Sequence, residues 1–296
     1  MKGLSDLPSK CQLYLLYTIT DTDGPGRRPV ERREDMPLLG VIGGSGLYDI
    51  PDLEITSMEK VSTPFGDPSD AYRIGKLAGR EAAFLPRHGA GHHLQPHRIN
   101  YRANLWGFRE LGVEKIVSVC ATGGINPEMG PGTIAVPDQI IDMTSGRMST
   151  FYDGDEVVHV DFTRPFCPDM RNFVAEAAAG AGLAAAMSGV YICVNGPRLE
   201  TAAEIRTFAA WGADMVGMTL MPEACLAREL EMCFTCIAVV TNAAAGIAAK
   251  KLTAKEVLET MKATEGKVRL LLTQLFSLEL RTSSCTCNQA LKEARL

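Results

Sequence analysis

The chain has 296 residues, of which 46% are hydrophobic and 22% charged, so it can bury a substantial core in one large domain or two small ones. Its formal net charge of −5 and its pI near 5.6 exclude the basic footprint of a nucleic-acid-binding or anionic-membrane-binding protein. The apolar run at residues 13–17 is too short to span a bilayer and lacks the features of a signal peptide.

Three zones follow one another along the chain. Residues 1–35 mix charged residues with Pro and Gly, and we expect them to form a disordered extension. Residues 36–277 alternate apolar strand segments with helical segments, which predicts a single α/β domain with a mostly parallel sheet. Residues 278–296 form a short tail.

The strands and helices of the middle zone are predicted from hydrophobic periodicity and helix-start signals. Strands are expected at 38–42, 115–121, 132–136, 189–194, 215–218 and 236–241, and helices at 101–111, 170–181, 201–211, 222–230 and 254–276. The last helix has the clearest start, because Thr253-Ala254-Lys255-Glu256 is a capping-box frame.

Two short segments point to an anion site. The first predicted strand runs into Gly43-Gly44-Ser45-Gly46, where glycines let backbone N–H groups approach a ligand and the Ser45 hydroxyl adds a donor. About forty residues on, another apolar run ends at Arg87-His88-Gly89, and Arg87 supplies a planar, permanently charged fork that suits phosphate. Each segment alone is compatible with a strand-end turn, but together they predict a phosphate site.

Nucleotide-cofactor and metal sites are not expected. A G-x-G-x-x-G frame that starts at Gly44 ends on Asp49, and no P-loop motif is present. Four histidines between residues 88 and 97 lie among Gly and Pro, which disfavours a regular ligand-bearing helix, and no second cluster completes a zinc site.

Further motifs carry a family resemblance. They are Gly43-Gly44-Ser45-Gly46, Arg87-His88-Gly89, Asn195-Gly196-Pro197-Arg198-Leu199-Glu200-Thr201 and Gly217-Met218-Thr219-Leu220-Met221-Pro222-Glu223, with segments 119–124, 151–154 and 240–242 matching as well. In their order and spacing the chain resembles the purine nucleoside phosphorylase/methylthioadenosine phosphorylase family over roughly residues 38–277.

The resemblance implies a three-layer α/β sandwich with a central mixed β-sheet flanked by helices, assembled as a homotrimer whose active sites are shared between subunits. It implies phosphorolysis, in which inorganic phosphate attacks C1′ of a nucleoside and releases the base and a pentose 1-phosphate. By position, the phosphate would be held by Ser45, Arg87, His88, Ala121 (through its N–H) and Thr219, while Met218 would lie against the sugar, Leu199 would cover the purine and His159 would reach into a neighbouring subunit's site. In one departure, Cys120 stands where relatives carry threonine, so that a hydroxyl–phosphate contact is missing or replaced.

The chemistry agrees with these roles. Breaking the glycosidic bond develops positive charge on the sugar and negative charge on the leaving base, so the enzyme needs an anionic nucleophile below C1′ and a hydrogen-bonding cradle around the purine. Neither a metal nor a redox cofactor is needed, and we expect none.

The base-site residues predict a 6-oxopurine nucleoside. Adenine-cleaving relatives place an aspartate pair where this chain has Asn242 and Ala244. The Asn242 amide can donate to a 6-oxo group and accept from N7–H, and the Glu200 carboxylate can accept from N1–H of hypoxanthine or guanine. Asn242, Glu200 and His88 are therefore the expected catalytic residues. The plainer interpretations are a strand-end turn residue for Asn242 and a helix N-terminal acid for Glu200.

The 5′ group of the sugar is less sharply specified. The start of the last helix, 251–254, contains no histidine for a 5′-hydroxyl, and Leu252 and Ala254 would suit a 5′-methylthio group. We expect 5′-methylthioinosine narrowly ahead of inosine and guanosine. Two alternatives remain open: 5′-methylthioadenosine phosphorylase activity, and a non-catalytic purine- or phosphate-binding module.

Cysteines give the last prediction. The count of nine is odd, and most of them stand in apolar segments, as reduced thiols do in cytoplasmic proteins. Cys285-Thr286-Cys287 in the tail resembles a C-x-C segment of some family members, which would be a redox-active or stabilising pair; two exposed thiols on a frayed end are the alternative.

Overall fold

The computed structural model describes residues 39–44, 52–248, 253–280 and 284–296. The strands are β1 (Leu39–Gly43), β2 (Glu54–Glu59), β3 (Tyr72–Leu77), β4 (Arg80–Pro86), β5 (Lys115–Gly124), β6 (Ile134–Ala135), β7 (Gln139–Met143), β8 (Ala185–Ala186), β9 (Val190–Val194), β10 (Met215–Gly217) and β11 (Cys233–Ala243). The helices are α1 (Tyr101–Glu110), α2 (Pro168–Gly180), α3 (Ala202–Ala210), α4 (Leu220–Glu229) and α5 (Ala254–Ser277), with 3-10 helices η1 (Pro96–Arg98) and η2 (Cys287–Gln289).

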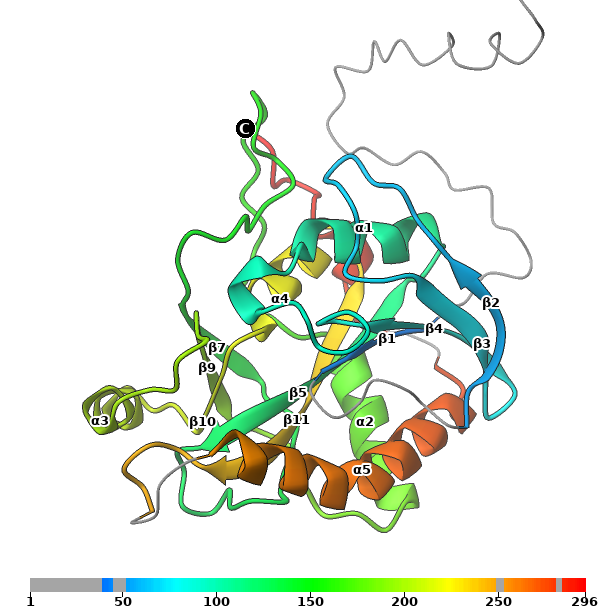
Figure 1. Ribbon diagram of the computed structural model, residues 1–296. Helices are drawn as coiled ribbons and strands as arrows, with labels where there is room; N and C mark the ends of the chain where they lie inside the picture. Colours follow the sequence, from blue (N-terminus) through cyan, green and yellow to red (C-terminus); the bar gives the residue numbers. More distant parts are fainter. Residues whose placement is uncertain (1–38, 45–51, 249–252, 281–283) are drawn as a thin grey trace, which may run out of the picture.

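Strands β5 and β11 run parallel through the middle of one mixed sheet (Figure 1). They are buried along almost their whole length, because helices cover both faces of the sheet, and this explains why they read as continuous apolar runs. Their side chains alternate between the two faces: Val117 and Val119 of β5 enter one core, whereas Ile116 and Cys120 enter the other.

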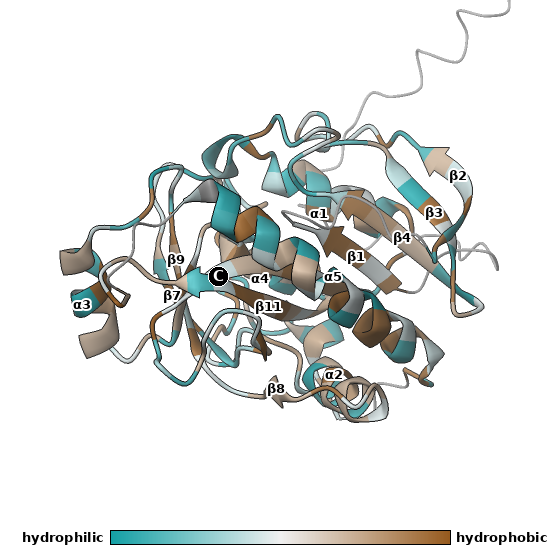
Figure 2. Cartoon of the chain, turned by 60° about the horizontal axis from the view of Figure 1, so that its bottom comes forward, coloured by the Kyte–Doolittle hydropathy of each residue, from teal (hydrophilic) through white to brown (hydrophobic). Residues whose placement is uncertain are grey.

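Helices form the two outer layers. On one face α2 packs against α5, and both contact β11; on the other, α1 packs against α4, which also contacts β11 (Figure 1). Figure 2 shows hydrophobic strands enclosed between helices whose hydrophilic residues face outward. The α5 residues Met261, Val268 and Leu271 belong to the core under α2, as the helical periodicity of this segment predicts.

The three-layer sandwich with a mixed sheet is confirmed, and six of the ten pairings between the described strands are parallel, as the alternation pattern predicts. The order β2-β3-β4-β1-β5-β10-β9-β7 contains antiparallel pairs at β2–β3, β3–β4 and β5–β10, and β6 pairs antiparallel with β11. Every predicted strand and helix is present within a few residues of its expected bounds. The sequence prediction missed β2, β3, β7 and the two-residue β8; β2 and β7 are largely exposed and carry no long apolar run.

Local signals explain how the elements begin. The Thr253 side chain accepts a hydrogen bond from the Glu256 N–H at 3.2 Å and caps α5 as expected. A complete capping box also starts α3, where Thr201 and Glu204 satisfy each other's backbone N–H groups. Among the described residues, no helix combines the length and apolar character required to cross a membrane.

Candidate active site

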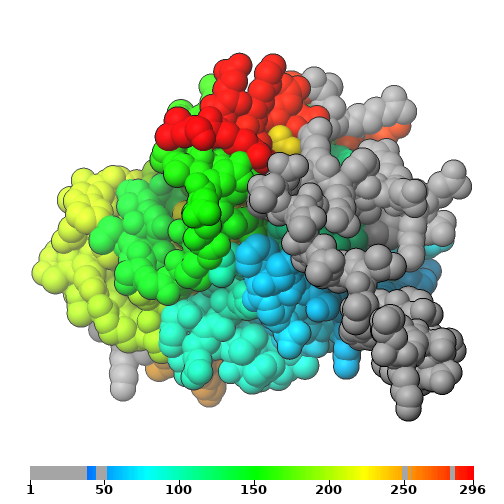
Figure 3. All heavy atoms as spheres, turned by 90° about the horizontal axis from the view of Figure 1, so that it is seen from above, coloured from blue at the N-terminus to red at the C-terminus, as the bar shows by residue number. Residues whose placement is uncertain are grey.

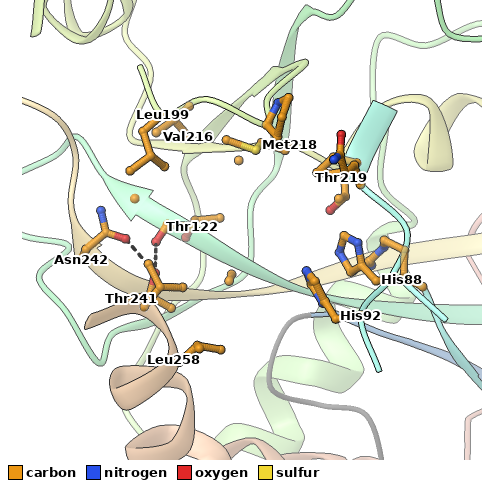
Figure 4. Close-up of a pocket in the computed structure, with 18 of the residues that line it drawn as sticks. His88, His92, Thr122, Leu199, Val216, Met218, Thr219, Thr241, Asn242 and Leu258 are labelled. Atoms are coloured by element: carbon orange, nitrogen blue, oxygen red, sulfur yellow. Dashed lines mark hydrogen bonds between the residues drawn. The ribbon is translucent and has the colours of Figure 1, made fainter. Parts of the chain in front are cut away.

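A cavity of about 550 Å³, within the range of ligand sites, opens beside the carboxyl ends of β4, β5 and β11. It is lined by Arg87, His88, His92, Leu94, Gln95, Pro96, Ala121, Thr122, Gly123, Pro197, Leu199, Glu200, Val216, Gly217, Met218, Thr219, Thr241, Asn242, Val257 and Leu258. Figure 4 shows Asn242 and Leu199 toward one end, Thr219 and His88 toward the other, and Met218 between them. This order matches the predicted sequence of base, sugar and phosphate.

The two predicted halves of the phosphate site meet at Arg87. Strands β1 and β4 are parallel neighbours, and the Arg87 N–H donates to the Gly43 carbonyl at 2.9 Å. A Cβ atom on Gly44 would lie 2.7 Å from Arg87 Nη1 and 2.6 Å from the Val119 carbonyl oxygen. Glycine is therefore required at position 44, because any side chain there would collide with the guanidinium and with the neighbouring strand.

Arg87 is 1% exposed and is held by a buried ion pair. Its Nε and Nη2 donate to the two carboxylate oxygens of Glu223 at 2.5 and 3.2 Å, Nη1 donates to the Val119 carbonyl oxygen at 3.0 Å, and Nη2 donates to Ser118 Oγ at 2.6 Å. Burial lowers the pKa of Arg87, but the charges of Glu223 and Cys120 and the hydrogen bond to Glu223 together outweigh it, so the pKa is raised overall. The remaining N–H of Nη1 has no partner among the described residues and lies at the Gly44 turn.

His88 is neutral in the free protein. Burial, and then the charge of Arg87, lower its pKa to about 3. Its Nδ1 lies 2.8 Å from the Leu94 carbonyl oxygen, which can only accept, so Nδ1 carries the proton and Nε2 is left as an acceptor. The ring stacks on His92 with centroids 4.1 Å apart. His88 can therefore accept a hydrogen bond from a protonated phosphate oxygen or from a sugar hydroxyl.

Cys120 is buried beside Arg87 and Thr219, two residues that line the cavity. Its Sγ is 3.6 Å from Arg87 Nη2 and 3.5 Å from Thr219 Oγ1. A hydrogen bond from Cys236 and the charge of Arg87 lower the pKa of the Cys120 thiol to about 6, against the opposing effect of its burial. A soft, weakly hydrogen-bonding sulfur thus lies beside Arg87 and Thr219, where a hydroxyl would form stronger hydrogen bonds.

A bulge in β11 aims Asn242 into the cavity. The pairing register with β5 shifts between Val240 and Asn242, so Thr241 and Asn242 both line the pocket although strand residues normally alternate between faces. Asn242 Nδ2 donates to the Ala243 carbonyl oxygen at 2.9 Å, and Oδ1 accepts from Thr241 Oγ1 at 2.8 Å (Figure 4). With the described residues as partners, one N–H of Nδ2 and one lone pair of Oδ1 stay available to a ligand.

Glu200 lies directly before α3. The capping box of Thr201 and Glu204 fixes the chain direction there, and Arg198 Nη2 pairs with Glu204 Oε1 at 2.7 Å rather than with Glu200. Burial raises the pKa of the Glu200 carboxyl. The site therefore holds one acidic acceptor that has no hydrogen bond to that arginine.

Comparison with known proteins agrees with this geometry. The family model described as the Phosphorylase superfamily matches residues 38–277. The chain belongs to the Phosphorylase superfamily. The resemblance inferred from its motifs is thereby confirmed.

This phosphorylase superfamily chain is similar to several named proteins. It is 49% identical to the 6-oxopurine nucleoside phosphorylase of Pyrococcus furiosus over 88% of this chain and 99% of that protein. It is 47% identical to the probable S-methyl-5'-thioinosine phosphorylase of Thermodesulfovibrio yellowstonii (86% and 96% covered) and 46% identical to the S-methyl-5'-thioadenosine phosphorylase of Thermofilum pendens (86% and 97%). In structure it is similar to the methylthioadenosine phosphorylase of Schistosoma mansoni in complex with adenine, at a TM-score of 0.83 and 30% identity over 88% of this chain and 99% of that one.

Two predicted site residues of this superfamily member, Ala244 and His159, do not line the cavity. A third, Ser45, lies outside the described residues. Ala244 is 2% exposed and belongs to a small core with Ile205 and Val216, because it follows the β11 bulge. His159 is exposed on a segment that pairs with the C-terminal tail.

Other lining residues were not predicted. Thr122 directly follows the predicted strand at 115–121 and Thr241 ends the predicted strand at 236–241, and these positions could have marked them. Val257 and Leu258 belong to the apolar periodicity of the last predicted helix, which predicts packing on the sheet, whereas in this phosphorylase superfamily chain they border the cavity. Of the expected 5′-pocket residues, Leu252 and the side chain of Ala254 lie outside what the structure describes.

Proposed function

We propose that this protein catalyses the phosphorolysis of 6-oxopurine nucleosides to the free base and a ribose 1-phosphate, in nucleoside salvage. The observation that carries the proposal is the Asn242 amide, which is 7% exposed and keeps one donor and one acceptor for a ligand in the cavity. The donor matches a 6-oxo oxygen, and the acceptor matches N7–H of the departing base. The Asn242 amide can also donate a hydrogen bond to the departing 6-oxopurine anion while it remains neutral itself.

Glu200 supports the same substrate class. Its carboxylate can accept from N1–H, which hypoxanthine and guanine possess and neutral adenine lacks. An unmade buried pairing costs on the order of 1–3 kcal/mol. Two such mismatches therefore discriminate against a 6-aminopurine by about 30-fold or more.

The phosphate end supports the reaction type. Arg87, Ala121 and Thr219 all line the cavity, and Thr219 lies toward the end away from Asn242 (Figure 4). Two hydrogen bonds to Glu223 already orient the Arg87 guanidinium before phosphate arrives, so it does not reorganise during the reaction. Glu223 also neutralises much of the Arg87 charge. Inorganic phosphate is the co-substrate in this proposal, and the charges that develop on sugar and base are met by phosphate and by Asn242, so no metal or redox cofactor is required.

The wall at α5 favours a methylthio group. Val257 and Leu258 border the cavity from the helix, and burying one methylthio group against such a surface contributes about 1–2 kcal/mol. We therefore place 5′-methylthioinosine narrowly ahead of inosine and guanosine. The names of the 6-oxopurine and S-methyl-5'-thioinosine relatives support this choice.

A second candidate is 5′-methylthioadenosine. It is favoured by the relatives in Thermofilum pendens and Schistosoma mansoni whose names give that nucleoside. In this candidate Asn242 protonates N7 indirectly through a water molecule.

A homotrimer with shared sites and a cytoplasmic location complete the proposal. His159 is exposed and outside its own chain's cavity, so a role in catalysis requires a neighbouring subunit. Light scattering on the purified protein should give three chains per particle. Co-expression of a His159→Ala chain with an Asn242→Ala chain should restore activity above that of either variant alone, and no restoration would contradict a shared site. The eight described cysteines are free thiols, which supports a reducing compartment.

One assay tests the substrate proposal. Base release in the presence and absence of phosphate is followed in parallel for 5′-methylthioinosine, inosine, 5′-methylthioadenosine and adenosine. We expect hypoxanthine release to be well ahead of adenine release, and 5′-methylthioinosine to be ahead of inosine. Faster adenine release would replace the first candidate by the second, and no phosphate-dependent release from any of the four would refute both.

A further inference from the structure

Four cysteines that are distant in sequence meet at one point, and we call them the thiol cluster: Cys167, Cys233, Cys285 and Cys287. Their Sγ atoms all lie within 4.8 Å of one another, and Cys233 Sγ is 3.6 Å from Cys285 Sγ. Three of the four are buried, and Cys285 is half-buried. Cys167 caps the N-terminus of α2, Cys233 begins β11, and the other two belong to the C-terminal tail, where Cys287 begins η2.

We propose that the thiol cluster binds one structural zinc ion. Zinc in structural sites takes four ligands in a tetrahedron, commonly four thiolates at about 2.3 Å, which sets the sulfur atoms about 3.8 Å apart. The cluster already approaches this arrangement, so small side-chain adjustments bring all four sulfurs to bonding distance. The cluster contains no carboxylate or imidazole ligand, and an all-thiolate set selects a soft or borderline ion over magnesium or calcium.

The surroundings fit a charged metal–thiolate group. Binding forms four Zn–S bonds and releases the thiol protons to solvent, which leaves a net charge of −2 on the group and changes no oxidation state. Arg228 Nη1 lies 3.9 Å from Cys287 Sγ and supplies positive charge beside it. Its Nη2 donates to the Arg164 carbonyl oxygen at 2.6 Å, which fixes the guanidinium in this position.

Asp169 orders the loop that carries Cys285. Its carboxylate accepts from the backbone N–H of Ser284 at 3.1 Å and of Cys285 at 3.2 Å, and it is also hydrogen-bonded to the Ser284 hydroxyl. Asp169 is itself buried in the first turn of α2, two residues after Cys167. The same helix start therefore supplies one sulfur and positions another, as outer-shell groups do in metal sites.

The location indicates a structural role. Strand β11 has Cys233 at one end and Asn242 near the other, about 30 Å apart at 3.3 Å per residue. At that distance from Asn242 the ion would not reach the cavity end of the strand, and it would attach the tail to the core. Beyond the cluster the tail pairs with the segment around His159. Arg295 and Val158 form an antiparallel β-bridge through their backbones, and the His159 N–H donates to the Ala294 carbonyl oxygen at 2.8 Å. Figure 3 shows the tail, in red, lying over this part of the surface.

This arrangement revises the prediction from the tail sequence. Cys285 and Cys287 are not two exposed thiols on a frayed end, because Cys287 is 2% exposed and both join two cysteines of the domain. The expected absence of a metal rested on the four histidines between residues 88 and 97, of which His88 and His92 line the cavity and none is part of the thiol cluster.

The test uses the full chain, reduced with a phosphine under nitrogen, stripped with a chelator, and titrated with Zn²⁺ or with Co²⁺ as a spectroscopic probe. We expect one ion bound per chain, the thiolate-to-cobalt charge transfer and visible bands of a tetrahedral cobalt site, and a higher melting temperature with zinc than without. The double variant Cys285→Ser/Cys287→Ser should lose the bound ion and its spectrum. The matched control Cys225→Ser, a half-buried cysteine outside the cluster, should keep both.

The proposal fails if the reduced wild-type chain binds neither ion stoichiometrically, whatever the behaviour of the variants. Formation of disulfides within the cluster by such a non-binding chain would identify it as a redox-linked pair instead. Binding by the double variant equal to that of the wild type would also refute the assignment. None of these readouts depends on the enzymatic activity.

Discussion

Replacing Asn242 by aspartate should move substrate preference from 6-oxo- toward 6-aminopurine nucleosides. The carboxylate has no N–H to offer a 6-oxo oxygen, so it creates one mismatch there, and it removes the mismatch between the amide donor and a 6-amino group. At about 1–3 kcal/mol for each buried pairing, the ratio of kcat/KM between the two classes should change by at least about 2 kcal/mol, or about 30-fold.

The local contacts of Asn242 determine which kinetic quantity reports base recognition in the variant. The Thr241 hydroxyl can still donate to an aspartate at 2.8 Å, but the donor to the Ala243 carbonyl oxygen is lost, and a carboxylate oxygen would face that carbonyl. Activity on every substrate should therefore fall, and only the ratio between substrates reports base recognition.

The assay compares hypoxanthine release from 5′-methylthioinosine with adenine release from 5′-methylthioadenosine under saturating phosphate. Asn172→Asp, the same change at an exposed position of α2, serves as a matched control and should leave the ratio unchanged. If Asn242→Asp folds normally and keeps the wild-type ratio, the proposed base cradle is wrong.

Three further outcomes follow from the site. Cys120→Thr should lower the KM for phosphate by about 3–10-fold, because a hydroxyl donates to an anion more strongly than a thiol does; phosphate titration at saturating nucleoside checks this, and an unchanged KM would show that position 120 does not touch phosphate. Glu223→Gln should reduce the free energy of unfolding by about 3–5 kcal/mol, because Arg87 keeps a buried charge without its counter-ion; denaturant unfolding measures it, and a change below about 1 kcal/mol would contradict the importance of the pair. Burial raises the pKa of Glu200, and the carboxylate is the form that accepts N1–H, so the KM for 6-oxopurine nucleosides should rise as the pH falls through that raised pKa. Glu200→Gln should abolish this rise of KM at low pH. If the rise persists in the variant, it belongs to another group.

The sequence alone determined the elements whose signals are local. The buried strands around residues 115–121 and 236–241 are predominantly apolar, and Thr253 caps the helix that its frame predicts. The same holds for the chemistry of the motif residues, because the guanidinium of Arg87 and the amide of Asn242 have the same hydrogen-bonding capacity in any fold. Family membership followed from the order of these motifs.

Tertiary structure decided what depends on distant parts of the chain. No local signal pairs Arg87 with Glu223, 136 residues away, and none shows that the bulge in β11 turns Asn242 into the cavity while Ala244 enters the core. The thiol cluster joins a helix start, a strand start and the tail, and only packing brings them within reach of one ion. The physical reason is common to these cases: side-chain chemistry is a property of the residue, whereas the charge, burial and partners that direct it are set by elements that meet only in the folded chain.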